Sequence, residues 1–137
     1  MIMDKYTLYT VRIFNRDFKK YHDHYVCPCC NYPTLHGRMG YEICGLCDWE
    51  DDGQDDENEN EVLGGPNTDY SLTEARDNFA KYLTMYRPED KAQFARFDKN
   101  KILPIKELYD RALNEHDKTE INTIIKKAHR LEGALRK

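Results

Sequence analysis

Apolar residues recur at helical spacing through most of the C-terminal half of the chain. From Ser71 onward they fall three or four positions apart. Ser71 and Glu74 form a capping box, in which each side chain accepts from the other residue's amide, and this is typical of the start of a helix. Pro88 is expected to stop this helix. Its predicted buried face consists of Leu72, Ala75, Phe79, Tyr82, Leu83 and Tyr86.

Further helices are expected beyond Pro88. A short one contains Phe94 and Phe97, and a longer one begins at Pro104, since proline suits the first position of a helix. Asp117 or Thr119 caps the last helix. The predicted buried faces are Ile105, Leu108, Tyr109, Ala112 and Leu113 in the longer helix, and Ile121, Ile124, Ile125, Ala128, Leu131 and Leu135 in the last.

The first 25 residues fit two patterns. Alternation over residues 7–13 favours a strand, whereas spacing over residues 8–21 fits a helical stripe. We expect an extended start followed by a helix. The alternating set is Thr7, Tyr9, Val11 and Ile13, and the helical set is Leu8, Val11, Phe14, Phe18 and Tyr21.

The middle of the chain has no long periodic stretch. Residues 26–50 hold all five cysteines together with turn-forming residues, which favours a two-stranded ribbon connecting two cysteine pairs. Residues 51–70 are predicted to be loop, because they combine acidic residues with the turn cluster Gly64-Gly65-Pro66-Asn67. The apolar cover of the ribbon is expected to come from Tyr41, Ile43 and Trp49.

These patterns predict a small α+β fold, in which a zinc-ribbon-like two-stranded unit packs with a mainly helical C-terminal half. At 137 residues the chain is long enough for one domain with a small metal-held lobe. We divide it into an N-terminal extension (1–25), a cysteine-containing unit with an acidic loop and a capped helix (26–87), and a C-terminal helical region (88–137).

Charge is distributed unevenly. The net charge is −4, but residues 48–61 contain nine acidic residues and neither lysine nor arginine. Subtracting these nine negative charges leaves +5 for the remainder of the chain. An acidic loop attached to a mildly basic body is typical of binding to a partner. We expect its unbalanced carboxylates to repel one another and remain mobile.

The cysteine spacing is the strongest chemical signal. Cys27 and Cys30 form one C-x-x-C pair, and Cys44 and Cys47 form another. Four thiolates complete a tetrahedral site that suits one Zn(II) ion, and a site with four protein ligands is closed and structural. Two disulfides are a weaker explanation, because the spacing suits a metal better and the odd count leaves one thiol over.

The remaining thiol and the nearby histidines have modest roles in this interpretation. Cys29 is expected to be a small side chain in a tight turn, with a redox-sensitive thiol as the alternative. His22, His24 and His36 are near enough in sequence to replace a cysteine, but four thiolates make this unnecessary. They are expected to be surface groups or hydrogen-bond donors around the metal ligands.

Other classes of site have little support. Residues 48–59 follow part of an EF-hand register, but Glu50 occupies its third position, Asp55 its eighth, and a metal knuckle precedes it where a helix is required. No nucleophile pattern or phosphate-binding loop is present, so no catalytic residue is assigned. There is no secretory leader and no apolar run of transmembrane length, which predicts a cytoplasmic protein.

Four segments resemble the bacterial cysteine-rich CPCC family. In order, they are Cys27-Pro28-Cys29-Cys30, residues 41–52 (YEICGLCDWEDD), Gly64-Gly65-Pro66-Asn67 and residues 71–79 (SLTEARDNF). The resemblance implies a zinc-ribbon-like unit followed by a capped helix. Some members are similar to immunity proteins of toxin systems. This chain departs from the shorter form of the family by an acidic insertion after Asp52 and by a long extension after Phe79.

The resulting hypothesis is a non-enzymatic zinc-binding module that binds a protein, such as a basic nuclease toxin that it neutralises. The expected contact residues are Asp51, Asp52, Asp55, Asp56, Glu57, Glu59 and Glu61. One alternative is a nucleic-acid-binding regulator that uses Lys126, Lys127 and Arg130. The other is a thiol redox or metal-handling protein that uses Cys29. A membrane partner is not expected.

Overall fold

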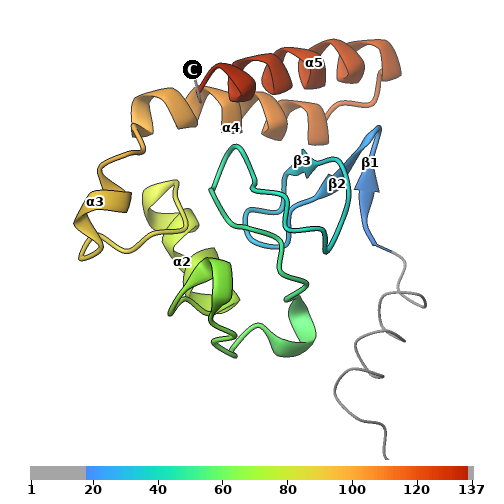
Figure 1. The fold of residues 1–137 in the computed structure, drawn as a ribbon. Coiled ribbons are helices and arrows are strands. Elements are labelled where there is room, and N and C mark those ends of the chain that lie inside the picture. The colour runs from blue at the N-terminus through green and yellow to red at the C-terminus, as the bar shows by residue number, and fades with distance from the viewer. Residues whose placement is uncertain (1–17, 136–137) are drawn as a thin grey trace, which may run out of the picture.

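The computed structural model describes residues 18–135, in which three short strands precede four α-helices (Figure 1). This arrangement confirms the predicted small α+β fold. Two 3-10 helices, Asp56–Asn58 and Gly65–Asn67, interrupt the loop between the strands and the first long helix. The predictions made for residues 4–17 lie outside the described residues. Tyr21, which was assigned to a helical stripe, belongs to a strand.

The strands form one antiparallel sheet in the order β1 (Lys20–Tyr21), β2 (His24–Val26) and β3 (Pro33–Leu35). The prediction of a two-stranded ribbon connecting the cysteine pairs is therefore wrong in detail. Between the cysteine pairs, β3 pairs with β2, which precedes the first pair, and the residues after β3 bend, because Met39 and Tyr41 both have left-handed backbone conformations, with φ of 64° and 63°.

Helix α2 (Leu72–Tyr82) begins as predicted, since the Ser71 hydroxyl accepts from the Glu74 amide at 3.0 Å. The Glu74 carboxylate accepts from Arg87 at 2.7 Å through each oxygen, rather than reaching back to Ser71. The helix ends before Tyr86 and Pro88. Leu83 adopts the left-handed conformation with φ of 62° and its amide donates to the Phe79 carbonyl.

Three helices follow: α3 (Lys91–Phe94), α4 (Lys99–Leu113) and α5 (Lys118–Ala134). The start predicted at Pro104 is wrong, because the Asp98 side chain caps α4 and leaves Pro104 inside the helix. The amide that Pro104 lacks would have reached only Asn100, near the helix start. Asp117 caps α5, accepting from the amides of Thr119 and Glu120.

The two long helices lie side by side and cover the cysteine-containing unit (Figure 1). Their predicted buried residues are buried except Leu113, which is 41% exposed, and Leu131 and Leu135, which are only partly buried against the core. Trp49 is buried, but Tyr41 and Ile43 are 58% and 45% exposed and do not cover the cysteine-containing unit. The buried residues of the helical pair are Ile102, Ile105, Leu108, Tyr109 and Ala112 of α4, with Ile121, Ile124, Ile125 and Ala128 of α5.

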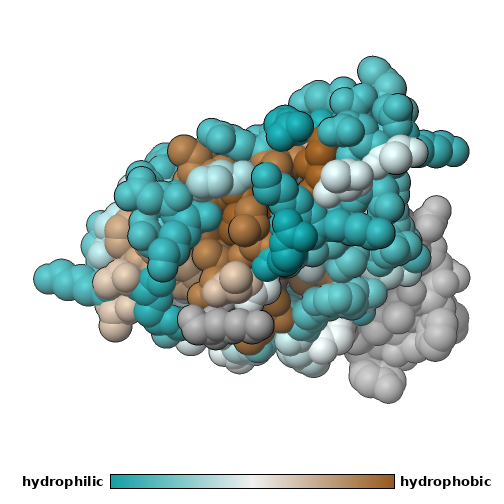
Figure 2. Space-filling model, turned by 90° about the horizontal axis from the view of Figure 1, so that it is seen from above, coloured by the Kyte–Doolittle hydropathy of each residue, from teal (hydrophilic) through white to brown (hydrophobic). Residues whose placement is uncertain are grey.

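The outer side of the helical pair is partly apolar. Figure 2 shows a hydrophobic area surrounded by hydrophilic surface on this side, and a groove between α4 and α5 is lined there by Pro104, Ile105, Leu131, Ala134 and Leu135. Within residues 18–135, none of the helices combines the length and apolar character needed to cross a membrane.

Candidate metal centre

Each cysteine pair lies at the tip of a short antiparallel turn, and the two turns repeat the same hydrogen bonds. The Cys27 amide donates to the Tyr32 carbonyl, as the Cys44 amide does to Trp49, both at 2.9 Å. The carbonyls of Cys27 and Cys44 each accept an amide from four residues further on. Those two residues, Asn31 and Asp48, both have left-handed conformations, which Asn and Asp tolerate best after glycine.

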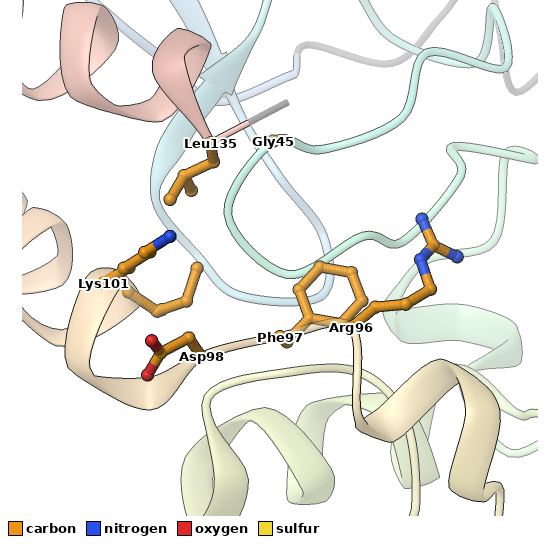
Figure 3. Close-up of a pocket in the computed structure, with 7 residues that line it drawn as sticks. Gly45, Arg96, Phe97, Asp98, Lys101 and Leu135 are labelled. Atoms are coloured by element: carbon orange, nitrogen blue, oxygen red, sulfur yellow. The ribbon is translucent and has the colours of Figure 1, made fainter. Parts of the chain in front are cut away.

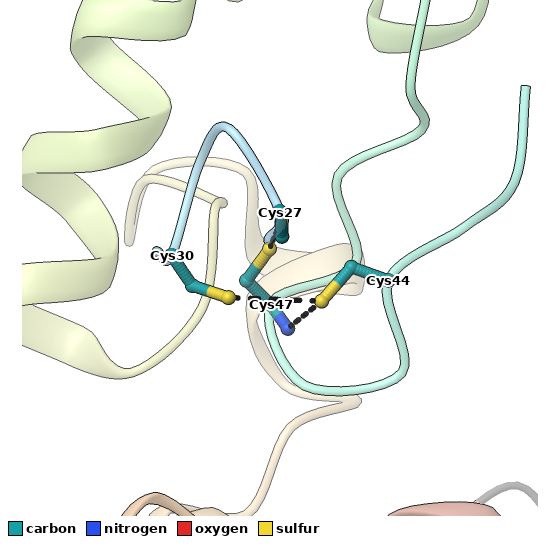
Figure 4. A group of neighbouring side chains, drawn as sticks. All are labelled: Cys27, Cys30, Cys44 and Cys47. Carbon is teal, nitrogen blue, oxygen red and sulfur yellow. Dashed lines mark hydrogen bonds between the residues drawn. The ribbon is translucent and has the colours of Figure 1, made fainter. Parts of the chain in front are cut away.

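The two turns bring four sulfur atoms together (Figure 4). The sulfurs of Cys27 and Cys47 lie 3.7 Å apart, those of Cys30 and Cys44 lie 3.8 Å apart, and all four lie within 4.8 Å of one another. A regular tetrahedron with metal–sulfur bonds of about 2.3 Å has edges of about 3.8 Å. The four predicted ligands therefore fit a single tetrahedral ion.

The surroundings of the cluster favour thiolates once an ion is bound. The Thr34 hydroxyl lies 3.0 Å from the Cys44 sulfur, and the amides of Leu46 and Cys47 donate to the same sulfur at 3.4 Å. Burial raises the pKa of the Cys30 and Cys44 thiols. These thiols must therefore lose protons when an ion binds, so binding weakens as the pH falls.

The C-terminal helix closes the second cysteine turn. The buried Glu132 carboxylate of α5 lies so close to Gly45 that a β-carbon there would overlap Glu132 Oε1. Tyr109 of α4 donates its hydroxyl to Glu132 at 2.5 Å. Burial and the neighbouring Glu132 raise the pKa of Tyr109, so its hydroxyl keeps its proton. Position 45 thus requires glycine because of a residue 87 positions further along the chain.

A cavity of about 400 Å³ adjoins the same turn (Figure 3). Gly45 and Leu135 border it from one side, and Phe97 and Lys101 from the other. The Arg96 guanidinium lies over the Phe97 ring, 5.4 Å from its centre. The residues around this cavity include no histidine, cysteine or serine, and its Asp98 side chain caps α4 by accepting from the Asn100 amide.

The acidic loop is held against the cysteine-containing unit rather than extended into solvent. Arg38 donates to Asp51 at 2.9 Å and to Asp55 at 3.0 Å, and the Arg38 side chain is only 5% exposed. Burial disfavours the charge on Arg38, but both carboxylates outweigh this effect and raise its pKa. The expectation of mutually repelling, mobile acids is therefore wrong for Asp51 and Asp55, which are buried.

Arg76 of α2 fastens the outer part of the loop. Its guanidinium pairs with Asp56 at 2.8 Å, with Asp55 at 3.8 Å, and also with Glu59. The same side chain donates to the Pro28 carbonyl at 2.8 Å, which lies within the first cysteine turn. Sequence reasoning did not identify Arg38 or Arg76, because neither belongs to a cluster of basic residues.

The exposed part of the loop combines charge with apolar side chains. We call residues 56–63 the acidic ridge; Glu57 and Glu61 are exposed there, and Val62 and Leu63 are 56% and 44% exposed. Its backbone is fixed, because Gln54 donates to the carbonyls of Asn58 and Glu61. Of the expected contact residues, Asp51 is fully buried, Asp55 is nearly so, and Asp52 is half-buried with a pKa that burial raises.

The remaining candidate residues are distributed differently. Cys29 is 6% exposed, and burial raises the pKa of its thiol. His22 is exposed in the turn between β1 and β2, whereas His24 and His36 lie beside His129 of α5. Lys126, Lys127 and Arg130 are all exposed on α5. Within residues 18–135 the structure thus provides neither an exposed fifth thiol nor a histidine at the cluster.

Fold and site together define a small α+β protein with a buried four-cysteine cluster compatible with metal binding. The family described as Cysteine-rich CPCC matches residues 25–99, which is more than half of the chain. The protein therefore belongs to the cysteine-rich CPCC family, and α4 and α5 lie almost entirely outside the matched segment. Neither the curated proteins nor the solved structures include a match.

Proposed function

We propose that the four cysteines hold one structural Zn(II) ion. The sulfur spacing supports this, because both closest pairs match the edge length of a zinc–thiolate tetrahedron. All four ligands come from the protein and the cluster is buried, which leaves no coordination position for a substrate. Such an ion stabilises the fold and does not take part in a reaction.

Metal analysis of the purified protein tests this assignment. We expect one zinc per chain, and Co(II) substitution should give the visible absorption of tetrahedral thiolate coordination. Cys44→Ser should lose the ion, whereas Cys29→Ser should keep it, since Cys29 is outside the tetrahedron. Loss of zinc from Cys29→Ser, or retention of stoichiometric zinc by Cys44→Ser, would contradict the assignment.

We infer that the zinc-held unit serves to bind another protein through the acidic ridge. Exposed Val62 and Leu63 beside exposed carboxylates suit a partner whose apolar pocket has a basic rim. Arg76 holds the side chains of Asp56 and Glu59, and Gln54 holds the ridge backbone, which lowers the entropy lost on binding. The most specific form of this proposal is neutralisation of a basic toxin, such as a nuclease.

The decisive experiment measures binding to the product of the neighbouring gene. We expect binding that weakens with salt, and a loss of affinity of about tenfold or more in Glu61→Lys/Val62→Ser. Glu107→Lys is the matched control, because it reverses an exposed charge on α4 away from the ridge. Equal loss in both variants would show a general charge effect and would overturn the proposed surface.

Protection of cells from that gene product tests the toxin-neutralising form separately. Binding without protection would remove the immunity role and leave the protein-binding role. Salt-dependent binding to duplex DNA that is lost in Lys126→Glu/Lys127→Glu would instead favour the nucleic-acid alternative.

A further inference from the structure

The rings of three histidines from separate parts of the chain lie against one another, with tilted planes, where α5 meets the sheet, and we call them the histidine stack. His24 of β2 is the central ring; its centre lies 3.8 Å from that of His129 on α5 and 4.7 Å from that of His36, just after β3. His129 Nε2 lies 3.0 Å from the Pro33 carbonyl of β3. This cluster and Glu132 line a pocket of about 310 Å³ above Gly45.

The spacing of the His24 and His129 rings shows that they contact each other and do not bind one metal ion together. Two imidazoles on one tetrahedral zinc, with bonds of about 2.0–2.1 Å, have ring centres about 5 Å apart. The His24–His129 spacing of 3.8 Å is too short for this arrangement and fits ring-on-ring contact. His24 Nδ1 is buried without a hydrogen-bond partner, which suits a neutral ring better than a charged one.

The stack accepts one proton more easily than two. His36 is 79% exposed on its side chain and lies 2.9 Å from the Glu42 carboxylate, so a charge there is solvated and paired. His24 and His129 face each other and His36, with Asp23 and Glu42 as the nearby acids. On the α4 side the Tyr109 ring centre lies 5.8 Å from that of His129, and Glu132 lines the same pocket. Burial, followed by the neighbouring histidines, lowers the pKa of His24 to about 4, and burial also lowers that of His129.

We propose that the histidine stack is an acid-sensitive latch, and that entry of a second proton separates α5 from the sheet and lifts Glu132 from Gly45. Two adjacent imidazolium rings repel, and water can solvate both charges only after the rings part. His129 and Glu132 are neighbours on α5, so movement of that helix uncovers the second cysteine turn. The proposal does not depend on the identity of the partner.

Hydrogen exchange of the zinc-loaded protein at pH 7.5 and pH 5 tests the latch, with each amide normalised to its intrinsic rate. In the closed form the pKa of His24 is about 4, and on opening it should return to its usual 6.5. The open form therefore binds a proton more tightly, which raises the equilibrium constant for opening by up to about 30-fold at pH 5. We therefore expect α5 amides to lose protection about tenfold or more, while α2 amides change little and zinc content stays constant.

Two variants make the result specific. His24→Phe keeps a ring in the stack but cannot bind a proton, so it should abolish the acid-dependent loss of protection. His116→Gln removes an exposed histidine outside the stack and should behave like the unmodified protein. Unchanged α5 protection at pH 5, the same acid response in His24→Phe, or opening that occurs only with zinc release would each overturn the latch.

Discussion

The acidic loop and the C-terminal helical pair are attached to the same cysteine unit by different forces. Residues 51–63 of the acidic loop are held mainly by Arg38 and Arg76, two arginines that lie outside this segment. The helical pair is held by a continuous apolar face that includes fully buried Tyr109. The cysteine unit is thus joined to the loop by ion pairs and to the helical pair by burial of apolar surface.

The two attachments should differ in how they lose stability when residues are replaced. An apolar face loses stability gradually as contacts are removed, because each side chain contributes its own buried area. A buried ion pair fails abruptly, since removing one partner leaves the other charged in a poor solvent. The stability of the loop attachment should therefore be sensitive to single charged residues. The stability of the helical pair should instead be sensitive to how closely its side chains pack.

Removal of the metal should have the largest effect, because both attachments use the cysteine unit. Structural zinc supplies apparent binding free energies of about 10–16 kcal/mol in small zinc-finger peptides. We expect Cys44→Ser or a strong chelator to unfold residues 26–50 and release the loop, while α4 and α5 keep helical circular dichroism by packing on each other. An unchanged thermal melt after metal removal would contradict a structural ion.

Arg38→Met should be the most damaging change to the loop attachment. It leaves Asp51, whose side chain is 1% exposed, without its buried cation, and breaking such a pair costs about 3–5 kcal/mol. Denaturant unfolding should show this loss. The double variant Arg38→Met/Asp51→Leu should recover much of it, and no recovery would mean that Arg38 acts mainly through other contacts.

Gly45→Ala should have an intermediate effect and should act on the helical pair. The added methyl group would overlap Glu132, and overpacking of this kind costs about 1–3 kcal/mol. Gly37→Ala is the matched control, because a β-carbon there has no neighbour within 4 Å. Equal stability of the two variants in urea unfolding would mean that α5 shifts without cost.

Arg76→Gln should have the smallest effect, and the effect should depend on salt. Arg76 is 27% exposed and its partner Asp56 is 75% exposed, so each pair contributes about 0.2–1 kcal/mol. We expect the stability difference from the unmodified protein to shrink between 50 mM and 1 M NaCl. A difference that is independent of salt would point to the Pro28 hydrogen bond as the main contribution.

Local signals in the sequence predicted the parts of the structure that depend on neighbouring residues. Each C-x-x-C pair, the Ser71 cap and the Asp117 cap involves positions within a few residues of one another, and only the meeting of the two cysteine pairs spans a longer stretch of chain. The buried stripes of α4 and α5 were predictable for the same reason, because helical periodicity is a local property. Pro104 is an exception, since a better cap at Asp98 was available just upstream.

What the sequence did not reveal depends on contacts between distant segments. Arg76 meets Asp56 across 20 positions, and Tyr21 donates to the Ala112 carbonyl across 91. Burial of Glu132 within an otherwise apolar stripe is understandable only from Gly45 and Tyr109 opposite it. A charge count of the acidic loop likewise cannot show which carboxylates face arginine and which face solvent.

The position of the cysteine ligands early in the chain, and of their cover late in it, has a consequence during synthesis. Cys47 completes the ligand set about 85 residues before Glu132 is added. At the elongation rates of about 5–20 residues per second, the thiols wait roughly 4–17 seconds before the closing helix exists. The four ligands are therefore available to an ion for seconds before α5 exists to cover them.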